Sequence, residues 1–226
     1  VVALVGTGLL TIALGLLAYD LAGKQAGAVL GTALAIKMIA YVGFAPIANA
    51  LAERVDRKNL LIGADLVRLG VALLLPLVGE VWQVYLLIFV LQAASASFTP
   101  AFQATIPDIL PDEADYTKAL SLSRLAYELE NLASPALAGV LLLVTSYHLL
   151  FTGTAIGFLG SAVLVWFAAV PPRNIAVPNR SFGERLTRGS RIYLATPRLR
   201  GLLGLNLTAA AASAFVIVNT VVIVRS

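Results

Sequence analysis

Seven long apolar runs, separated by charged or proline- and glycine-containing turns, dominate this sequence of 226 residues. A helix needs about 20 apolar residues to cross a lipid bilayer, and each run is close to that length. Hydrophobic residues make up 59% of the chain, too large a fraction for a soluble domain whose surface must face water. We therefore predict an all-α integral membrane protein with spans at approximately 1–20, 28–51, 60–79, 81–104, 118–145, 149–170 and 201–224.

The basic residues concentrate in alternate turns between these runs. Seven of the sixteen lysines and arginines lie between residues 171 and 200, and the turn after the second run holds three more. By the positive-inside rule, we expect both segments, the turn at 108–118 and the start of the chain to be cytoplasmic. The net charge of +4 then reflects contact with anionic membrane lipids, and nucleic acid is not an expected partner.

The turn after the second run is a dense cluster of charge, NALAERVDRKNLLIGADLVR at residues 49–68. Its spacing resembles the pattern G-x-L-A-D-R-x-G-R-K-x-x-L between the second and third helices of major facilitator superfamily transporters. The positions that agree are Leu51, Ala52, Arg54, Arg57, Lys58 and Leu61, with Glu53 standing for the aspartate. Asn49 and Asp56 replace the two glycines. Asp56, followed by Asp65 and Arg68 on the next helix, resembles the efflux branch that contains macrolide and enterobactin exporters.

The resemblance implies a six-helix N-terminal bundle at residues 1–170, built from two inverted three-helix repeats. A basic cytoplasmic linker at 171–200 and a seventh transmembrane helix at 201–226 would begin a C-terminal half that is missing from this chain. The resemblance also implies gate residues that latch one state of an alternating-access cycle and do not contact the substrate. These gate residues are Glu53, Arg54, Arg57, Lys58, Asp65 and Arg68. The alternative interpretation is an ordinary basic turn on the cytoplasmic side.

Polar residues inside the apolar runs are candidates for the wall of a transport cavity. Lys37 lies roughly 13 Å from the outer end of its run at 1.5 Å per residue, too deep for an unpaired ammonium in lipid. Tyr41 lies one turn away on the same face. The fourth run carries one polar stripe, and the fifth adds a further candidate: Gln92, Ser95, Thr99 and Gln103, then Asn131. The alternative is that these side chains only bond neighbouring helices.

Three carboxylates are candidates for proton coupling: Glu130, Glu128 and Asp20. Arg124 precedes Glu128 by one helical turn and is predicted to pair with it, so Glu130 is the better candidate. The alternative is that these groups only hold helices together. The sequence SPALAG at 134–139 resembles the GPxxGG signature of the superfamily's antiporters. Its members Ser134, Pro135 and Gly139 are expected to allow close helix packing.

An enzyme is a poor explanation for this chain, because it has no cysteine, a single histidine, no phosphate-binding glycine loop and no acidic metal cluster. No cofactor or metal is expected. A channel would need a repeated filter sequence. The resemblance implies a secondary transporter in the cell inner membrane that exports a small drug-like or siderophore-like amphipathic compound in exchange for protons. Transport of lipid or lysophospholipid, or of metal ions, is the alternative within the same fold.

Overall fold

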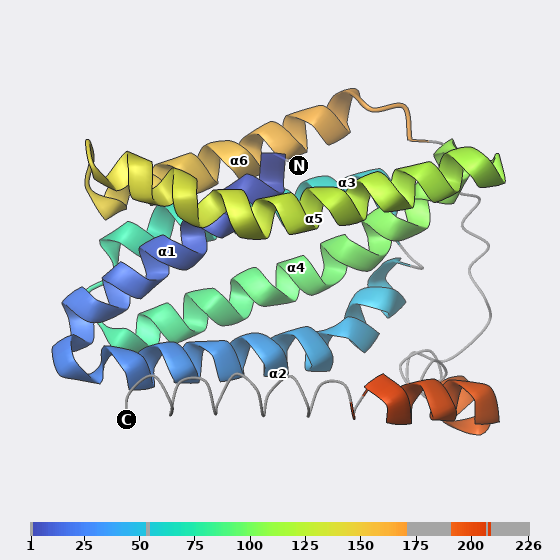
Figure 1. The fold of residues 1–226 in the computed structure, drawn as a ribbon, viewed down its shortest axis with the longest axis horizontal. Coiled ribbons are helices and arrows are strands. Elements are labelled where there is room, and N and C mark those ends of the chain that lie inside the picture. Colours follow the sequence, from blue (N-terminus) through green and yellow to red (C-terminus); the bar gives the residue numbers. More distant parts are fainter. Residues whose placement is uncertain (1, 53–54, 171–190, 207, 209–226) are drawn as a thin grey trace. The chain divides into compact units, whose positions relative to one another are not determined.

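The computed structural model describes residues 2–52, 55–170, 191–206 and 208. The chain divides into two compact units, Val1–Pro178 and Asn179–Ser226. The described part of the first unit contains α1 (Val2–Ala22), α2 (Ala26–Ala52), α3 (Arg57–Leu74), α4 (Val81–Ile109), α5 (Glu113–Leu142) and α6 (Tyr147–Phe167), with short 3-10 helices η1 (Gly23–Gln25) and η2 (Leu75–Leu77) (Figure 1). In the second unit, residues 191–195 and 197–206 are helical. The described residues hold no β-strand, which confirms the predicted all-α fold.

Each of the first six predicted spans corresponds to one helix, although several helix ends differ from the predicted limits. α3 begins at Arg57 instead of residue 60, α4 continues to Ile109 instead of 104, and α5 begins at Glu113 instead of 118. The added residues are mostly polar, so hydropathy alone does not detect them. The predicted linker at 171–200 and seventh span at 201–224 lie largely outside the described residues.

Local sequence signals define the short turns between the helices. The Asp112 side chain caps the start of α5 by accepting hydrogen bonds from the backbone N–H groups of Ala114 at 2.9 Å and Asp115 at 3.2 Å. The Gln83 side chain accepts one from the N–H of Glu80 at 3.1 Å at the start of α4. Gly23 takes a φ of +51° between α1 and α2, a conformation that favours glycine. Such short connections reverse the direction of the chain from one helix to the next.

Four helical segments of the described chain are long and apolar enough to cross a membrane: Val2–Tyr41, Arg57–Leu77, Val81–Ile109 and Tyr147–Phe167. The first of these includes all of α1 and part of α2. α5 is also long enough at 30 residues, but it carries six charged side chains. A helix of this kind is stable in a bilayer where its polar face meets protein or water. Large apolar side chains are exposed along the bundle, as expected for a surface in contact with lipid.

The core of the first unit lies where α1, α3, α4 and α6 meet. Buried apolar side chains from all four helices form it, including Leu10, Val71, Leu91, Phe151 and Phe158. α1 packs chiefly against α6, α2 against α4, and α3 against both α4 and α6. α5 packs chiefly against α1 and touches α4 and α6 only slightly. The position of α5 therefore depends mainly on its contact with α1.

α1 and α6 approach most closely at Gly6 and Gly157. The Thr154 hydroxyl on α6 donates a hydrogen bond to the carbonyl oxygen of Gly6 at 2.9 Å, across the helix interface. A Cβ at Gly157 would lie 3.1 Å from both the Cα of Gly6 and the carbonyl oxygen of Val2. Both are backbone atoms, so relief of this contact would require α1 and α6 to move apart.

We expect Gly157→Ala to lower the free energy of unfolding by about 1–3 kcal/mol, because overpacking at a backbone contact forces the helices to shift. The measurement is thermal unfolding of the purified protein in detergent. Gly15→Ala is the matched control, because no atom outside its own helical turn lies within 4 Å of the added Cβ. Equal changes in Tm for the two variants would contradict the prediction.

Candidate functional site

The two basic residues at the start of α3 bind the ends of two other helices. Arg57 forms an ion pair with Asp108 near the end of α4, and it donates to the carbonyl oxygen of Ala104 at 2.6 Å. The Lys58 ammonium donates to the carbonyl oxygen of Ala168, just after α6, at 3.0 Å. Cations are favourable at helix C-termini, where backbone carbonyls lack partners. These contacts join three helices at one end of the bundle.

Arg57 has a partner outside the predicted gate. The prediction grouped Arg57 with Asp65, and with Glu53 and Arg54, which both lie outside the described residues. In the structure, Arg57 pairs with Asp108, a residue not predicted to belong to the gate. A signal for it was present, because the turns containing Arg57 and Asp108 were both expected on the cytoplasmic side. Opposite charges in neighbouring turns on one side of a membrane can meet.

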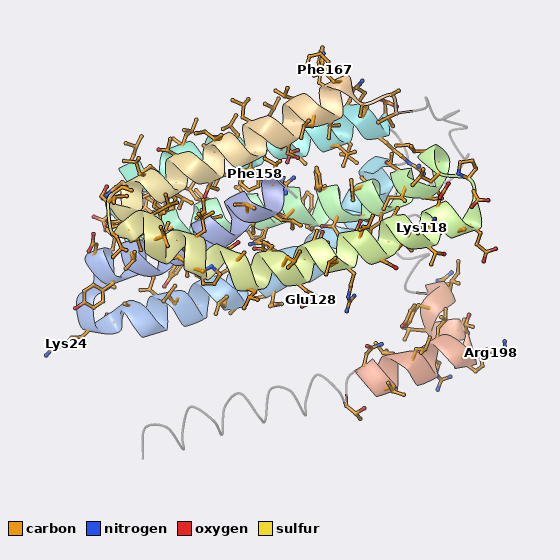
Figure 2. All side chains as sticks on the ribbon, turned by 45° about the horizontal axis from the view of Figure 1, so that its top comes forward. Lys24, Lys118, Glu128, Phe158, Phe167 and Arg198 are labelled. Atoms are coloured by element: carbon orange, nitrogen blue, oxygen red, sulfur yellow. The ribbon has the colours of Figure 1, made fainter. Side chains whose placement is uncertain are left out.

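Asp65 and Arg68 form an ion pair one turn apart on α3, and both are buried, with 0% and 6% of their surface exposed. The centre of the Arg68 guanidinium lies 4.2 Å from the ring centroid of Phe98 on α4. The same guanidinium lies 4.8 Å from the ring centroid of Phe158, a side chain of α6 inside the bundle (Figure 2). Cation–π contacts of this kind partly replace the water that a buried guanidinium loses.

The Asp65–Arg68 pair is incompletely satisfied. Oδ2 of Asp65 and Nε of Arg68 have no hydrogen-bond partner in the described part of the chain. Each unpaired polar atom in a low-dielectric interior adds to the desolvation penalty of the pair, which can exceed the attraction between the two charges.

Polar side chains of α2 and α5 form a second candidate group. Lys37 on α2 and Glu130 on α5 are both half-buried, and the two charged groups lie within electrostatic range of each other. Tyr127, one turn before Glu130, lies within the same range of Glu130, of Tyr41 on α2 and of Arg68. Among the described residues, no ion pair within 4 Å joins Lys37 to a carboxylate. Lys37 and Glu130 therefore lie within electrostatic range of each other without a direct salt bridge, and their role in a transport cavity stays a prediction.

The other two proton-coupling candidates lie apart from Glu130. Glu128 is exposed on α5 (Figure 2), and the predicted pair with Arg124 is wrong: both side chains are exposed and form no ion pair. An exposed pair one turn apart gains little over solvation by water. Asp20 lies at the exposed end of α1, where it accepts a hydrogen bond from the Tyr147 hydroxyl. It is about 18 Å along α1 from Gly8, the residue that touches Glu130.

The polar stripe of α4 is satisfied mostly within its own helix. The Ser95 hydroxyl donates to the carbonyl oxygen of Leu91 at 2.9 Å, and the Thr99 hydroxyl donates to that of Ser95 at 3.2 Å. Gln92 is half-buried and Gln103 is exposed. The two hydroxyls therefore keep only acceptor capacity, while no side-chain hydrogen bond within the described residues engages the two amides. The Asn131 side chain lies outside the described residues.

Of the three residues predicted to pack helices closely, only Ser134 does so. It is buried against Gly8 of α1. Pro135 and Gly139 are exposed, and a Cβ at Gly139 would meet no described atom within 4 Å. The prediction for these two residues is wrong for the described contacts, because their side of α5 faces away from α1. The contact of Ser134 with Gly8 depends on where α5 crosses α1, a point that residue spacing within one helix does not give.

Comparison with known proteins gives consistent matches. The family model described as Major Facilitator Superfamily matches residues 1–224. Macrolide efflux protein A of Streptococcus pyogenes is 28% identical over 152 residues, which cover 62% of this chain and 37% of the relative. Macrolide efflux protein A of Enterococcus faecalis is 28% identical over 152 residues, 63% of this chain and 47% of the relative. The uncharacterized MFS-type transporter YfiS of Bacillus subtilis is 32% identical over 122 residues, 54% of this chain and 29% of the relative.

No solved structure matches the chain. The chain spans less than half the length of the curated relatives that it matches. The family match nevertheless extends over almost every residue, and it agrees with the helical bundle and with the charged turn before α3. The chain belongs to the Major Facilitator Superfamily.

Proposed function

We propose that the complete protein is a secondary transporter that exports a small amphipathic compound in exchange for protons, by alternating access. Family membership supports a transporter rather than an enzyme. The names of the two macrolide efflux relatives support export, with a macrolide-like compound as the first substrate class to test. The other partners in this proposal are protons, membrane lipids and the second half of the transporter, and the location is the cell inner membrane.

The observation that carries proton coupling is the position of Glu130. Its carboxylate lies at the junction of α5 and α1 and interacts electrostatically with Lys37 of α2. Protonation would remove a negative charge from this junction and so change the attraction between α2 and α5. A group with this effect can favour one arrangement of helices when charged and another when neutral, which is what coupling to a proton gradient requires.

The ion pairs of α3 supply the gate in this proposal. Arg57 and Lys58 join α3 to the ends of α4 and α6, and Arg68 lies between aromatic rings of the same two helices. Movement of α3 relative to α4 and α6 during the transport cycle would break some of these contacts in one state. Their role is to set the populations of the two states, while the polar group around Glu130 exchanges the proton.

The test uses the complete transporter in proteoliposomes with a labelled macrolide. Substrate movement is measured under an imposed pH gradient and, separately, as exchange without a gradient. For Glu130→Gln we expect exchange to be retained and gradient-driven accumulation to be lost, because the amide cannot release a proton. Glu128→Gln is the matched control, since that carboxylate is exposed two residues away on the same helix. Normal gradient-driven export by Glu130→Gln would rule out the assigned role.

A further inference from the structure

α5 approaches α1 very closely at Gly8. A Cβ at Gly8 would overlap the Ser134 side chain and would lie 2.8 Å from Oε1 of Glu130. Glu130 and Ser134 are four residues apart on α5, so they occupy the same face of that helix. The carboxylate and the hydroxyl therefore lie side by side against the backbone of α1, in space that only a glycine leaves open.

The Ser134 hydroxyl has no partner. Ser134 is only 2% exposed, and its Oγ makes no hydrogen bond to any described residue. Elsewhere in the bundle, hydroxyls such as those of Ser97 and Thr105 donate to the carbonyl oxygen four residues earlier. The same bond from Ser134 would go to the backbone carbonyl of Glu130, and it is not formed. A buried hydroxyl that lacks even this local bond is unfavourable and calls for an acceptor.

We propose that Ser134 is a positioning residue for Glu130: its hydroxyl donates a hydrogen bond to the Glu130 carboxylate when that group is charged, and Gly8 provides the space in which the two meet. This inference rests on the proposed function, in which Glu130 gains and loses a proton. Rotation about the χ1 torsion of Ser134 changes the acceptor toward which its hydroxyl points. When Glu130 is protonated, its own O–H becomes the donor and the Ser134 oxygen the acceptor.

The surroundings of Glu130 make this hydroxyl matter. Lys37 of α2 lies within electrostatic range of the carboxylate, without an ion pair among the described residues, and Tyr127 of α5 lies within that range of Glu130, Arg68 and Tyr41. α1, the helix against which Glu130 packs, contributes no charged residue before Asp20. Ser134 is thus the donor of α5 that lies against the same point of α1 as the carboxylate. Loss of that donor should make the charged form of Glu130 harder to maintain.

The test is an infrared titration of the complete transporter in lipid, which follows the carboxyl band that disappears in Glu130→Gln. In Ser134→Ala, the midpoint of this titration is expected to rise by about one pH unit, because the charged form loses a hydrogen bond to a charged acceptor. Ser134→Cys keeps a weak donor and should shift the midpoint in the same direction by less. Ser121→Ala is the control, since that hydroxyl is exposed and donates to Thr117 on the same helix.

An unchanged midpoint in Ser134→Ala would overturn the inference, and would leave Ser134 as a packing residue. The readout does not depend on transport, so it separates this inference from the proposed function. A raised midpoint together with normal gradient-driven export by Glu130→Gln would support the Ser134 hydrogen bond and reject proton coupling through Glu130. A raised midpoint together with lost gradient drive supports both.

Discussion

Removal of one member of the buried ion pair on α3 is expected to destabilise the protein by about 3–5 kcal/mol, the largest stability effect predicted for any substitution in this chain. Asp65→Asn leaves the Arg68 charge without its counterion, and Arg68→Met leaves the Asp65 carboxylate alone in an interior position with 0% exposure. The double variant should recover most of the loss, because it removes both charges and their desolvation penalty. Unfolding of the purified protein by denaturant in detergent measures all three.

The chain contains a matched control for this experiment. Asp115 and Lys118 form an ion pair with the same i,i+3 spacing on α5, but both side chains are exposed, by 59% and 76%. Substitution of either one should cost less than about 1 kcal/mol, since exposed pairs gain little over solvation by water. If Asp65→Asn also costs less than about 1 kcal/mol, water reaches the Asp65–Arg68 pair, and the two residues do not act as a buried charge pair.

Much of the fold could be predicted from the sequence, because hydrophobic helices in lipid are a local property. Each run of about 20 apolar residues can satisfy its backbone only as a helix, so the existence of six helices followed from the sequence. The residues at which the helices begin and end were harder to predict. The sequence contained the cap that starts α5, Asp112 followed by an acidic turn, but hydropathy placed the start at residue 118 because the first turn is polar.

A candidate site residue could be predicted from the sequence where the residues of a single helix were enough to identify it. Glu130 and Lys37 stand out as ions in apolar surroundings and were identified on that ground, whereas the pair on α3 was identified from its resemblance to a family motif. The environment of the charged and polar residues comes from other helices. Phe158 packs on Arg68, Asp108 pairs with Arg57, and Gly8 lies against Ser134. These contacts depend on where two helices cross, and residue spacing within one helix contains no information about that point.

The one local pairing that was predicted, between Arg124 and Glu128, failed for the same physical reason. One helical turn allows the two side chains to meet, but both are exposed. Spacing describes only which contacts are geometrically possible. Burial decides which of them form, because only desolvated charges gain enough from a partner to offset the lost side-chain freedom.

The second large effect concerns transport rather than stability. We expect Arg57→Ala and Asp108→Asn each to slow transport by the complete protein by about tenfold or more, since coupling energies between states are typically 1–3 kcal/mol. Membrane insertion and equilibrium binding of substrate should stay close to the wild-type values, because neither residue is placed near the polar group around Glu130. Initial transport rates in proteoliposomes, measured beside substrate binding in detergent, test both expectations.

The geometry of the Arg57 contact makes a sharper form of this experiment possible. Arg57 binds both the Asp108 carboxylate and the carbonyl oxygen of Ala104, and its side chain is only 14% exposed, against 44% for Asp108. Both contacts come from Nη1 of Arg57; Arg57→Lys keeps the charge but places it on a shorter side chain with a different geometry, so its transport rate should fall between those of the wild type and Arg57→Ala. The charge swap Arg57→Asp with Asp108→Arg should recover part of the loss if the pair itself latches one state. Unchanged rates in Arg57→Ala and Asp108→Asn would mean that the charged turn only sets the orientation of the chain in the membrane, since a positive cytoplasmic turn needs no partner to do so.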